Sequence, residues 1–371
     1  MPSPAVPFFS PRGAAFGVDL GVCLQGVVDS GWYVLGPNVR EFEQAFARYV
    51  GVGHAVGVAN GTDALALALR ALGIGPGQRV ATVANAGCYA STAIAQVGAV
   101  PCFVDVDEGS LTLSPDRLRA TLRDGPVGAV ILTHLYGRMG EASAIAALCR
   151  QAGVPLIEDC AQAHGAVRAG RQAGAWGAVA CFSFYPTKNL GALGDGGAVL
   201  TDDTALAERL RALRQYGWAR KYEVALAGGV NSRLDELQAA VLLAKLPRLD
   251  AANAERRAIA TRYGAAFADL PLACPPLPGE DDVAHLYVVR TPRRAELQAH
   301  LAARGIASDV HYPVPDHRQP VRAGQAAPDL PVTEAACAEV LSLPCYPGLT
   351  PAQAEQVVGA VRGFFDQARP C

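Results

Sequence analysis

Lysine is scarce in this chain of 371 residues: of 32 basic residues only Lys188, Lys221 and Lys245 are lysines, and all the others are arginine. Arginine stays protonated, whereas a lysine in a desolvated site can lose its proton and attack a carbonyl carbon. Lys188 stands between an apolar run, CFSF, and a turn rich in glycine, GALGDGG. We therefore expect Lys188 to form a Schiff base, with an ordinary surface lysine as the alternative.

The chain also lacks a large excess of charge. Its formal net charge is -2, so a nucleic acid or an acidic membrane is not indicated as partner, and a small soluble ligand fits better. The ten cysteines form no CxxC pair, which indicates reduced, buried thiols. His285, His311 and His317 have no supporting cysteine or carboxylate spacing, so we expect no metal.

No segment has the pattern of a signal peptide or a membrane span. The N-terminus, MPSPAVPFFSPRGAA, is broken by prolines and has no basic stretch followed by a long apolar core. The uncharged stretch from Val80 to Val104 contains Asn85, Gly87 and Pro101, which favours buried strands and a helix over a spanning helix. We expect a cytoplasmic protein.

Short apolar runs alternate with helical patterns from residue 54 onward. The expected strands are His54–Ala59, Arg79–Ala84, Pro101–Val106, Gly128–Thr133, Pro155–Glu158, Val179–Phe184 and Gly197–Thr201. Because their apolarity is largely continuous, they should be buried on both faces, as in a mostly parallel seven-stranded α/β sheet covered by helices.

The length of the chain allows two domains. We expect an N-terminal arm and a large ligand-binding domain over 1–249, and a small C-terminal α+β domain over 250–371. The small domain should begin with a helix that ends at Leu270. Its later elements should be a strand at His285–Arg290, a helix at Arg294–Arg304 and a strand at Asp309–Tyr312.

Three features follow strands, at the edge where such sheets bind ligands. Gly61 and Thr62 start a helix, whose free N–H groups can bind a phosphate or serve as a plain helix cap. Asp159 ends another strand, where a carboxylate could bind a metal, cap a helix or hold a protonated ring nitrogen. Together with Lys188 these are the parts of a pyridoxal phosphate site. GALGDGG does not match GxGxxG, and no GxxxxGK follows a strand, so dinucleotide and P-loop sites lack their spacing.

Four motifs, ANGTDALALALRALGIGPG, IEDCAQAHGA, FSFYPTKNLGALGDGGAV and NSRLDELQAA, resemble the DegT/DnrJ/EryC1/StrS family of sugar aminotransferases. The resemblance runs from SGWYVLGP to LSLPCYPGLT and implies the fold type I aminotransferase architecture. It also implies a homodimer whose active sites lie at the subunit interface. Family members that became sugar dehydratases replace the lysine with histidine, so the TKN sequence at Lys188 indicates transamination.

The resemblance implies roles for individual residues around pyridoxal 5'-phosphate. Lys188 would form the Schiff base, and Asp159 would contact the pyridine nitrogen. The other implied cofactor contacts are Gly61, Thr62 and Ser183 at the phosphate, Gln162 and Tyr89 at the ring, and Asn231 from the partner subunit. The expected substrate contacts are Tyr33, Tyr185, His311, Tyr312 and His317.

The implied reaction moves an amino group from glutamate to a nucleotide-linked sugar, a dTDP-linked keto-6-deoxyhexose. The NSRLDELQAA and HYP…HRQP segments favour a 3-keto over a 4-keto sugar. Two alternatives stay open. One is a keto-cyclitol acceptor of the scyllo-inosose type, and the other is a cofactor-binding regulator, which would need a DNA-binding region for which we expect no room.

Overall fold

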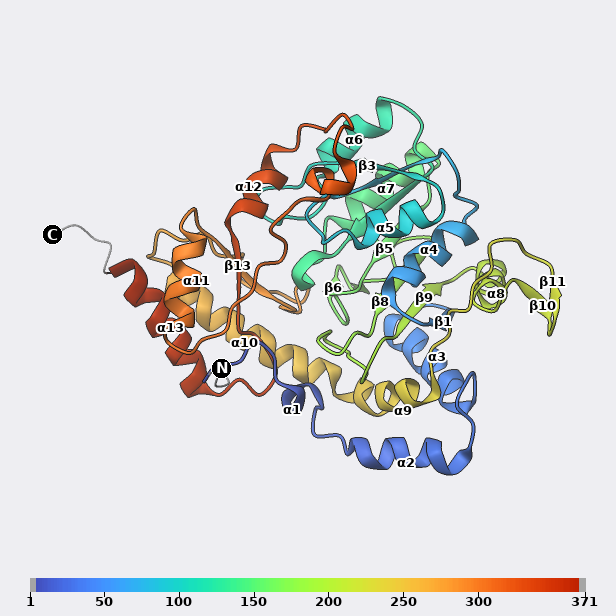
Figure 1. Ribbon diagram of the computed structural model, residues 1–371, viewed down its shortest axis with the longest axis horizontal. Helices are drawn as coiled ribbons and strands as arrows, with labels where there is room; N and C mark the ends of the chain where they lie inside the picture. The colour runs from blue at the N-terminus through green and yellow to red at the C-terminus, as the bar shows by residue number, and fades with distance from the viewer. Residues whose placement is uncertain (1–4, 367–371) are drawn as a thin grey trace.

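A seven-stranded sheet forms the centre of the protein, seen in a computed structural model that describes residues 5–366 (Figure 1). The strands are, in spatial order, β1 (His54–Val58), β9 (Gly197–Thr201), β8 (Val179–Ser183), β5 (Leu156–Asp159), β4 (Ala129–Thr133), β2 (Arg79–Thr82) and β3 (Val100–Phe103). Strand β9 runs antiparallel to both of its neighbours, and the remaining pairs are parallel. Each expected strand overlaps one of these, which confirms the predicted α/β fold.

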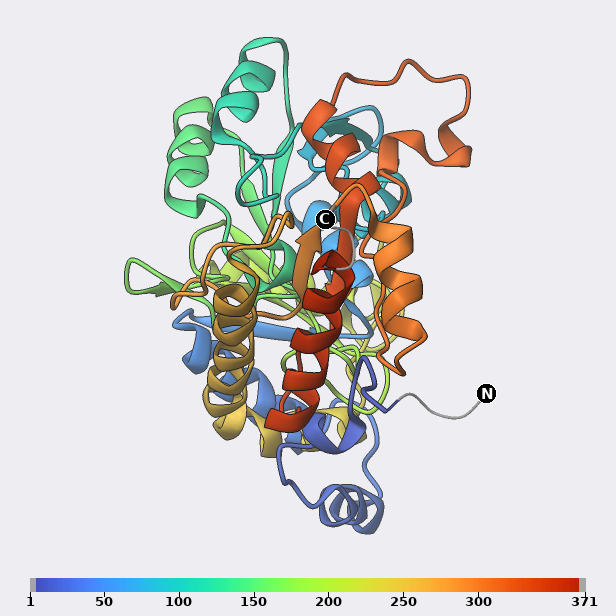
Figure 2. The ribbon, with the colours of Figure 1, turned by 90° about the vertical axis from the view of Figure 1, so that its left-hand side faces the viewer.

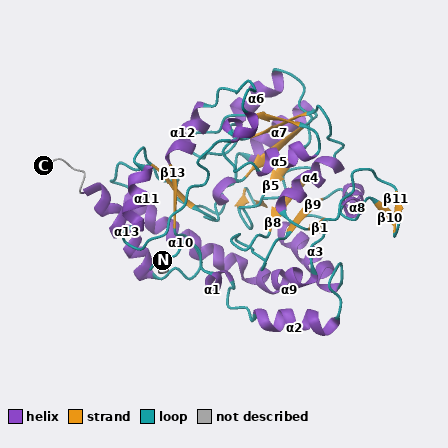
Figure 3. Cartoon of the chain, in the orientation of Figure 1, coloured by secondary structure: helices purple, strands orange, loops and turns teal. Residues whose placement is uncertain are grey.

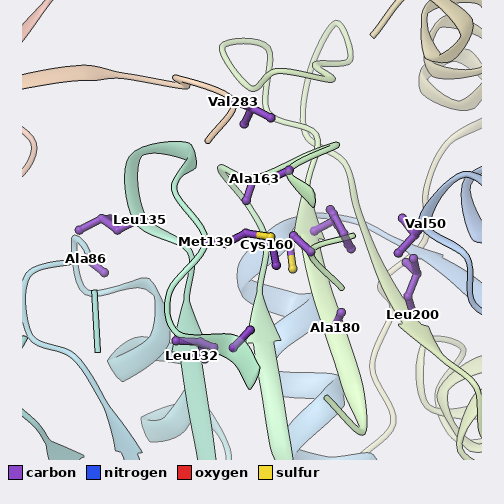
Figure 4. Close-up of a cluster of buried hydrophobic side chains, with 14 of the residues drawn as sticks. Val50, Ala86, Leu132, Leu135, Met139, Cys160, Ala163, Ala180, Leu200 and Val283 are labelled. Atoms are coloured by element: carbon purple, nitrogen blue, oxygen red, sulfur yellow. The ribbon is translucent and has the colours of Figure 1, made fainter. Parts of the chain in front are cut away.

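Helices cover both faces of this sheet. On one face lie α4 (Gly61–Ala71), α5 (Tyr89–Gln96) and α8 (Thr204–Leu213), and on the other lie α3 (Pro37–Val50), α6 (Pro115–Arg123), α7 (Ala142–Ala152) and α9 (Glu236–Lys245). Strand β4 illustrates the division, because Ala129 and Ile131 pack on the side of α4, α5 and α8, whereas Val130 and Leu132 pack on the side of α3, α6, α7 and α9. Figure 4 shows part of the cluster on the latter side, with Leu132 labelled. Both faces need apolar side chains, so the runs in the sequence are continuous.

Helix α3 receives the cap of its N-terminus from a distant helix. Its N-cap residue, Gly36, has no side chain to offer. The carboxylate of Glu236 at the start of α9 accepts hydrogen bonds from the backbone N–H groups of Gly36, Asn38 and Val39, at 2.7, 2.9 and 2.9 Å. This contact satisfies N–H groups that the helix cannot pair internally.

Residues from 249 onward build a separate packed cluster beside the sheet, the C-terminal cluster, which faces the viewer in Figure 2. Its elements are α10 (Leu249–Phe267), α11 (Arg294–Ala302), α13 (Pro351–Asp366) and the antiparallel pair β12 (Tyr287–Arg290) and β13 (Val340–Leu343). The expected strand at Asp309–Tyr312 is wrong, since only Asp309 bridges to Ser342. Pro313 and Pro315 follow at once and have no N–H to extend a ladder.

The N-terminal arm packs against this C-terminal cluster. The Val6 side chain is fully buried there, its N–H donates to Gly305 O at 3.0 Å, and Ala307 N–H donates to Val6 O at 2.9 Å. Two helices follow in the arm, α1 (Pro11–Ala14) and α2 (Leu20–Ser30). We propose domains at 1–249 and 250–371 with this arm spanning them; residues 1–4 and 367–371 lie outside the described part.

The remaining elements are short (Figure 3). They are β6 (Val167–Arg168), β7 (Arg171–Gln172), β10 (Trp218–Arg220), β11 (Glu223–Val224), α12 (Pro331–Glu339) and four 3-10 turns at Leu135–Gly137, Leu246–Arg248, Asp316–Arg318 and Pro320–Arg322. Within residues 5–366, no helix is both long and apolar enough to cross a membrane.

Candidate active site

A cavity of about 740 Å³ lies at the carboxyl ends of the parallel strands, between the sheet and the C-terminal cluster. Ten predicted site residues line it, although they come from segments far apart in the sequence. They are Gly61, Thr62, Tyr89, Asp159, Gln162, Ser183, Tyr185, Lys188, His311 and Tyr312. Parallel strands bring these segments together because their carboxyl ends share one edge of the sheet.

Lys188 and Asp159 both line this cavity and interact electrostatically. Burial lowers the pKa of the Lys188 amine to about 8, although the Asp159 charge opposes the shift. Burial raises the pKa of the Asp159 carboxyl. The hydrogen bond from the Ala161 N–H at 3.2 Å and the charge of Lys188 both oppose this rise. Within residues 5–366 the Lys188 amine makes no hydrogen bond, so it is free to react with a carbonyl carbon.

The start of α4 forms a cradle for an anion. Asn60 caps the helix by accepting the Asp63 N–H at 2.8 Å. The earlier N–H groups of the first turn have no helical partners, as at the start of any helix. A Cβ at Gly61 would lie only 2.7 Å from Ser183 Cβ, so glycine is what allows α4 to approach β8. The Ser183 and Thr62 side chains border the cavity at this point, and the arrangement suits a phosphate group.

Aromatic and amide side chains form the next wall. The Gln162 side chain accepts the Tyr136 N–H at 2.6 Å and donates to the Tyr312 hydroxyl at 3.3 Å. The Tyr89 and Tyr312 rings meet edge to face, with centroids 6.2 Å apart. Residue 87 has a φ of +78°, and a Cβ there would lie 2.8 Å from the Tyr312 ring, so Gly87 fits both requirements.

His311 and Tyr185 border the same cavity from opposite parts of the chain. The His311 ring stacks on Phe8 of the arm at 5.7 Å, and its Nδ1 pairs with the Ser342 hydroxyl at 2.9 Å. Tyr136 donates a short hydrogen bond to the His311 carbonyl. Tyr185 is 52% exposed, so its ring is accessible to a large ligand.

Three predicted site residues do not reach this cavity. His317 is buried elsewhere, beside Phe103, and its Nε2 pairs with Glu334 at 2.8 Å, so this chain gives it no contact with a ligand in the cavity. Tyr33 and Asn231 are exposed on the surface instead. The Tyr33 segment pairs with the start of α9, since Glu236 N–H donates to the Tyr33 carbonyl at 3.1 Å.

Sequence reasoning missed several residues of the cavity wall. His285 was considered only as a metal ligand, yet it lines the cavity, and its Nδ1 lies 2.8 Å from Asn189 Oδ1. The Asn189 Nδ2 group already donates to Asn253 and the Val283 carbonyl, so His285 must donate from Nδ1. Arg256 was also missed, because nothing in its helical pattern distinguishes it. Phe8 and Phe9 could have been found as paired aromatics in a proline-rich arm.

A buried cluster of His134, Glu158 and Cys160 lies at the same strand ends, with its potential ligand atoms within 4.8 Å of one another. The Glu158 carboxylate accepts N–H groups of Gly174, Trp176 and Gly177 at 2.9, 2.6 and 2.8 Å, and pairs with His134 Nε2 at 3.0 Å. These hydrogen bonds occupy the carboxylate and, with His134, hold its pKa below the usual value although burial opposes the shift. The cluster therefore fixes the strand end that carries Asp159.

Known proteins share both the sequence and this architecture. The chain is 46% identical over 371 residues to the dTDP-3-amino-3,4,6-trideoxy-alpha-D-glucose transaminase of Streptomyces venezuelae, across 98% of this chain and 97% of that protein. The crystal structure of S. venezuelae DesV in complex with a ketimine intermediate is 45% identical, with a TM-score of 0.94 over 100% of both chains. The structure of Bacillus subtilis NtdA with bound cofactor PMP is 28% identical, with a TM-score of 0.91 over 99% of this chain and 86% of that one.

The expected aminotransferase fold and enzyme class are thereby confirmed. Residues 22–362 match the DegT/DnrJ/EryC1/StrS aminotransferase family. That match, the whole-length relative and the structural likeness agree with the cavity built around Lys188 and Asp159. This chain belongs to the DegT/DnrJ/EryC1/StrS aminotransferase family.

Proposed function

We propose that this aminotransferase moves an amino group from glutamate to the 3-keto position of a dTDP-linked 6-deoxyhexose, with pyridoxal 5'-phosphate held through Lys188. One observation carries the proposal: a single cavity gathers a lysine with a pKa of about 8, the Asp159 carboxylate and the start of α4. The S. venezuelae relative is named for a dTDP-linked 3-amino sugar, which supports the nucleotide and the position.

Pyridoxal phosphate fits the groups that line this cavity. The phosphate would lie on the first turn of α4, where Gly61 allows close approach and the Thr62 and Ser183 hydroxyls can donate. Gln162 and Tyr89 would border the ring. When bound, this cofactor supplies the carbonyl carbon for amine exchange and a ring that takes up charge from the substrate carbon.

Asp159 and Lys188 would divide the proton chemistry between them. The Asp159 carboxylate, enclosed by protein, would keep a proton on the ring nitrogen. The Lys188 amine would take and return the proton at the substrate carbon, because a pKa of about 8 lets it do both near neutral pH.

We further propose a homodimer in which Tyr33 and Asn231 complete the partner's site. Both residues are exposed and lie outside the cavity of their own chain. Trp32, the sequence neighbour of Tyr33, is 56% exposed, so the surface around Tyr33 offers apolar area suited to a subunit contact.

Addition of glutamate to the purified protein tests the reaction. The absorbance of the cofactor bound through Lys188 should be replaced by that of the amine form, and Lys188→Ala should show no change. An unchanged spectrum with every common amino donor would overturn the proposal. The amine form should then react with dTDP-linked 3-keto sugars; reaction with scyllo-inosose alone would establish the cyclitol alternative instead.

Mixed dimers test the shared site. Lys188→Ala and Asn231→Ala variants should each be inactive alone, but dimers reassembled from both should recover part of the activity, because one of the two sites then carries neither substitution. No recovery, with dimers formed, would contradict a contribution of Asn231 to the partner's site.

A further inference from the structure

Arg256 on α10 is a buried arginine that pairs with no carboxylate in the described part of the chain. The side chain is 4% exposed and borders the cavity that contains Lys188. Its Nη1 donates to the carbonyls of His285 and Cys345, at 3.0 and 2.6 Å. Within residues 5–366, its Nε and Nη2 groups make no hydrogen bond and no acidic side chain forms an ion pair with it.

Such an arrangement is costly unless an anion joins it. A buried charge that lacks a counterion strongly destabilises the folded state. Burial lowers the pKa of Arg256, and no carboxylate opposes the shift. Arg214, which is also buried, illustrates the usual solution, because its guanidinium pairs with Glu43. The Nε and Nη2 groups of Arg256 can therefore donate hydrogen bonds to a bound anion, which would also neutralise the charge of the guanidinium.

The position of Arg256 separates it from the phosphate cradle. The cradle is built from α4 and β8, whereas Arg256 projects from α10 on the wall formed by the C-terminal cluster. His285 connects this wall to the reactive lysine: its carbonyl accepts from Arg256, and its ring pairs with Asn189, the neighbour of Lys188. The two anion-binding groups thus serve the same cavity from different elements.

The chemistry of this wall favours a carboxylate. The carbonyls of His285 and Cys345 hold Nη1 of Arg256, which leaves its Nε and Nη2 groups for a ligand. A guanidinium presents parallel N–H groups that match the two oxygens of a carboxylate.

We propose that Arg256 binds a carboxylate group of the amino-acid donor and so places the donor's amine next to Lys188. This inference rests on the proposed function, since it assigns a site for the donor of that reaction. It makes Arg256 a specificity residue for donors with a carboxylate and gives it no role toward the nucleotide-linked sugar.

Calorimetric titration of the cofactor-loaded protein with glutarate, a dicarboxylate that has no amine to react, measures this contact directly. We expect Arg256→Gln to bind glutarate roughly 10- to 100-fold more weakly than the wild type, because a charge-assisted contact is lost. Arg256→Lys should retain part of the affinity. Arg294→Gln is the matched control, since Arg294 also donates from its Nη1 to the backbone, at the Cys337 carbonyl (2.7 Å), but does not line the cavity.

The half-reaction with a keto sugar separates a donor site from general damage. The amine form of Arg256→Gln should react with the sugar at the wild-type rate. Equal glutarate affinity in wild type and Arg256→Gln, or equal loss in both half-reactions, would overturn the inference. If Arg256→Gln does not fold, a crystal structure of the wild type with glutarate decides: a carboxylate on Arg256 supports the site, and one bound elsewhere refutes it.

Failure of the inference and failure of the proposed function give different results. A wild type that reacts with glutamate while Arg256→Gln shows the same dependence on glutamate concentration refutes only the Arg256 site. A wild type that binds glutarate through Arg256 but reacts with no amino donor refutes only the proposed reaction.

Discussion

Replacement of Gly61 by alanine should weaken the binding of pyridoxal phosphate. The added Cβ would lie 2.7 Å from Ser183 Cβ and 3.3 Å from Ser183 Cα. Rotation of a side chain cannot relieve a contact with Cα, so α4 must move away from β8. Such overpacking costs about 1–3 kcal/mol. Because the same movement opens the phosphate cradle, we expect the Kd for the cofactor to rise roughly 5- to 150-fold.

Fluorescence titration of the cofactor-free protein with pyridoxal phosphate measures this change, and urea unfolding reports stability in parallel. Two alanine variants serve as controls. Gly359 on α13 has no atom within 4 Å of an added Cβ, so Gly359→Ala should gain about 0.5–1 kcal/mol of stability. At Gly264 the added Cβ would lie 2.7 Å from Leu277 Cδ2, the end of a flexible, exposed side chain. Both controls should bind the cofactor as the wild type does.

An unchanged Kd in Gly61→Ala would refute the argument that this glycine shapes the phosphate site. A similar loss of affinity in Gly264→Ala would also refute it, because the effect would then reflect any tight contact rather than the cradle.

Three further substitutions probe charge and capping. Lys188→Met should make the cofactor-free protein roughly 3 kcal/mol more stable at pH 7, because burial lowers the pKa of Lys188 from 10.5 to about 8 and the protonated amine is disfavoured in the folded state. Between about pH 8 and pH 10.5 the unfolded wild type keeps a proton on Lys188 that the folded wild type has lost. Wild-type stability should therefore rise with pH, and the stability difference from Lys188→Met should fade above about pH 10.5. A stability difference that does not depend on pH in urea unfolding would contradict the lowered pKa. Glu236→Ala should lower the free energy of unfolding by about 2–4 kcal/mol in the same assay, because three backbone N–H groups at the start of α3 lose their acceptor. Glu41 is exposed, so Glu41→Ala should change this free energy by less than about 0.5 kcal/mol. Asp105 accepts hydrogen bonds from the N–H and the hydroxyl of Thr333 in α12, at 2.9 and 2.8 Å. Asp105→Ala should therefore lower the free energy of unfolding by about 1–3 kcal/mol and speed hydrogen exchange in α12. Unchanged exchange would show that this contact does not stabilise α12.

The sheet could be predicted because its physical requirements are local. Each strand needs apolar side chains on both faces, and each carries them as a continuous run that ends at a loop. Helix α2 was missed, although Asp19 caps its start by accepting the Val22 N–H and Gly31 ends it with a φ of 63°. Those two signals were present in the sequence, but the apolar pattern between them has only one buried residue, Val27.

The predicted positions of the cavity residues depended on one rule about parallel sheets. Gly61 and Lys188 follow β1 and β8, and Asp159 ends β5. Because these three strands point in the same direction, their places along the chain predict a common edge. The rule does not extend to side chains outside the sheet. His317 carries the same donor groups as His311, but Glu334 and Phe103 hold it away from the cavity. Tyr33 and Asn231 do not line that cavity within their own chain.

The family, the mostly parallel sheet and the reactive lysine could be predicted from the amino-acid sequence, because they depend on residue types in local patterns and on the order of motifs. The surroundings of that lysine depend on how the chain folds. Burial lowers the pKa of Lys188, an effect of atoms supplied by many segments. Arg256 and His285 enter the cavity wall through contacts of α10 and the loop before β12. Burial and the absence of a counterion depend on the whole fold, so no local pattern encodes them, and a lysine in a motif becomes a lysine with a defined pKa and neighbours only when the chain has folded.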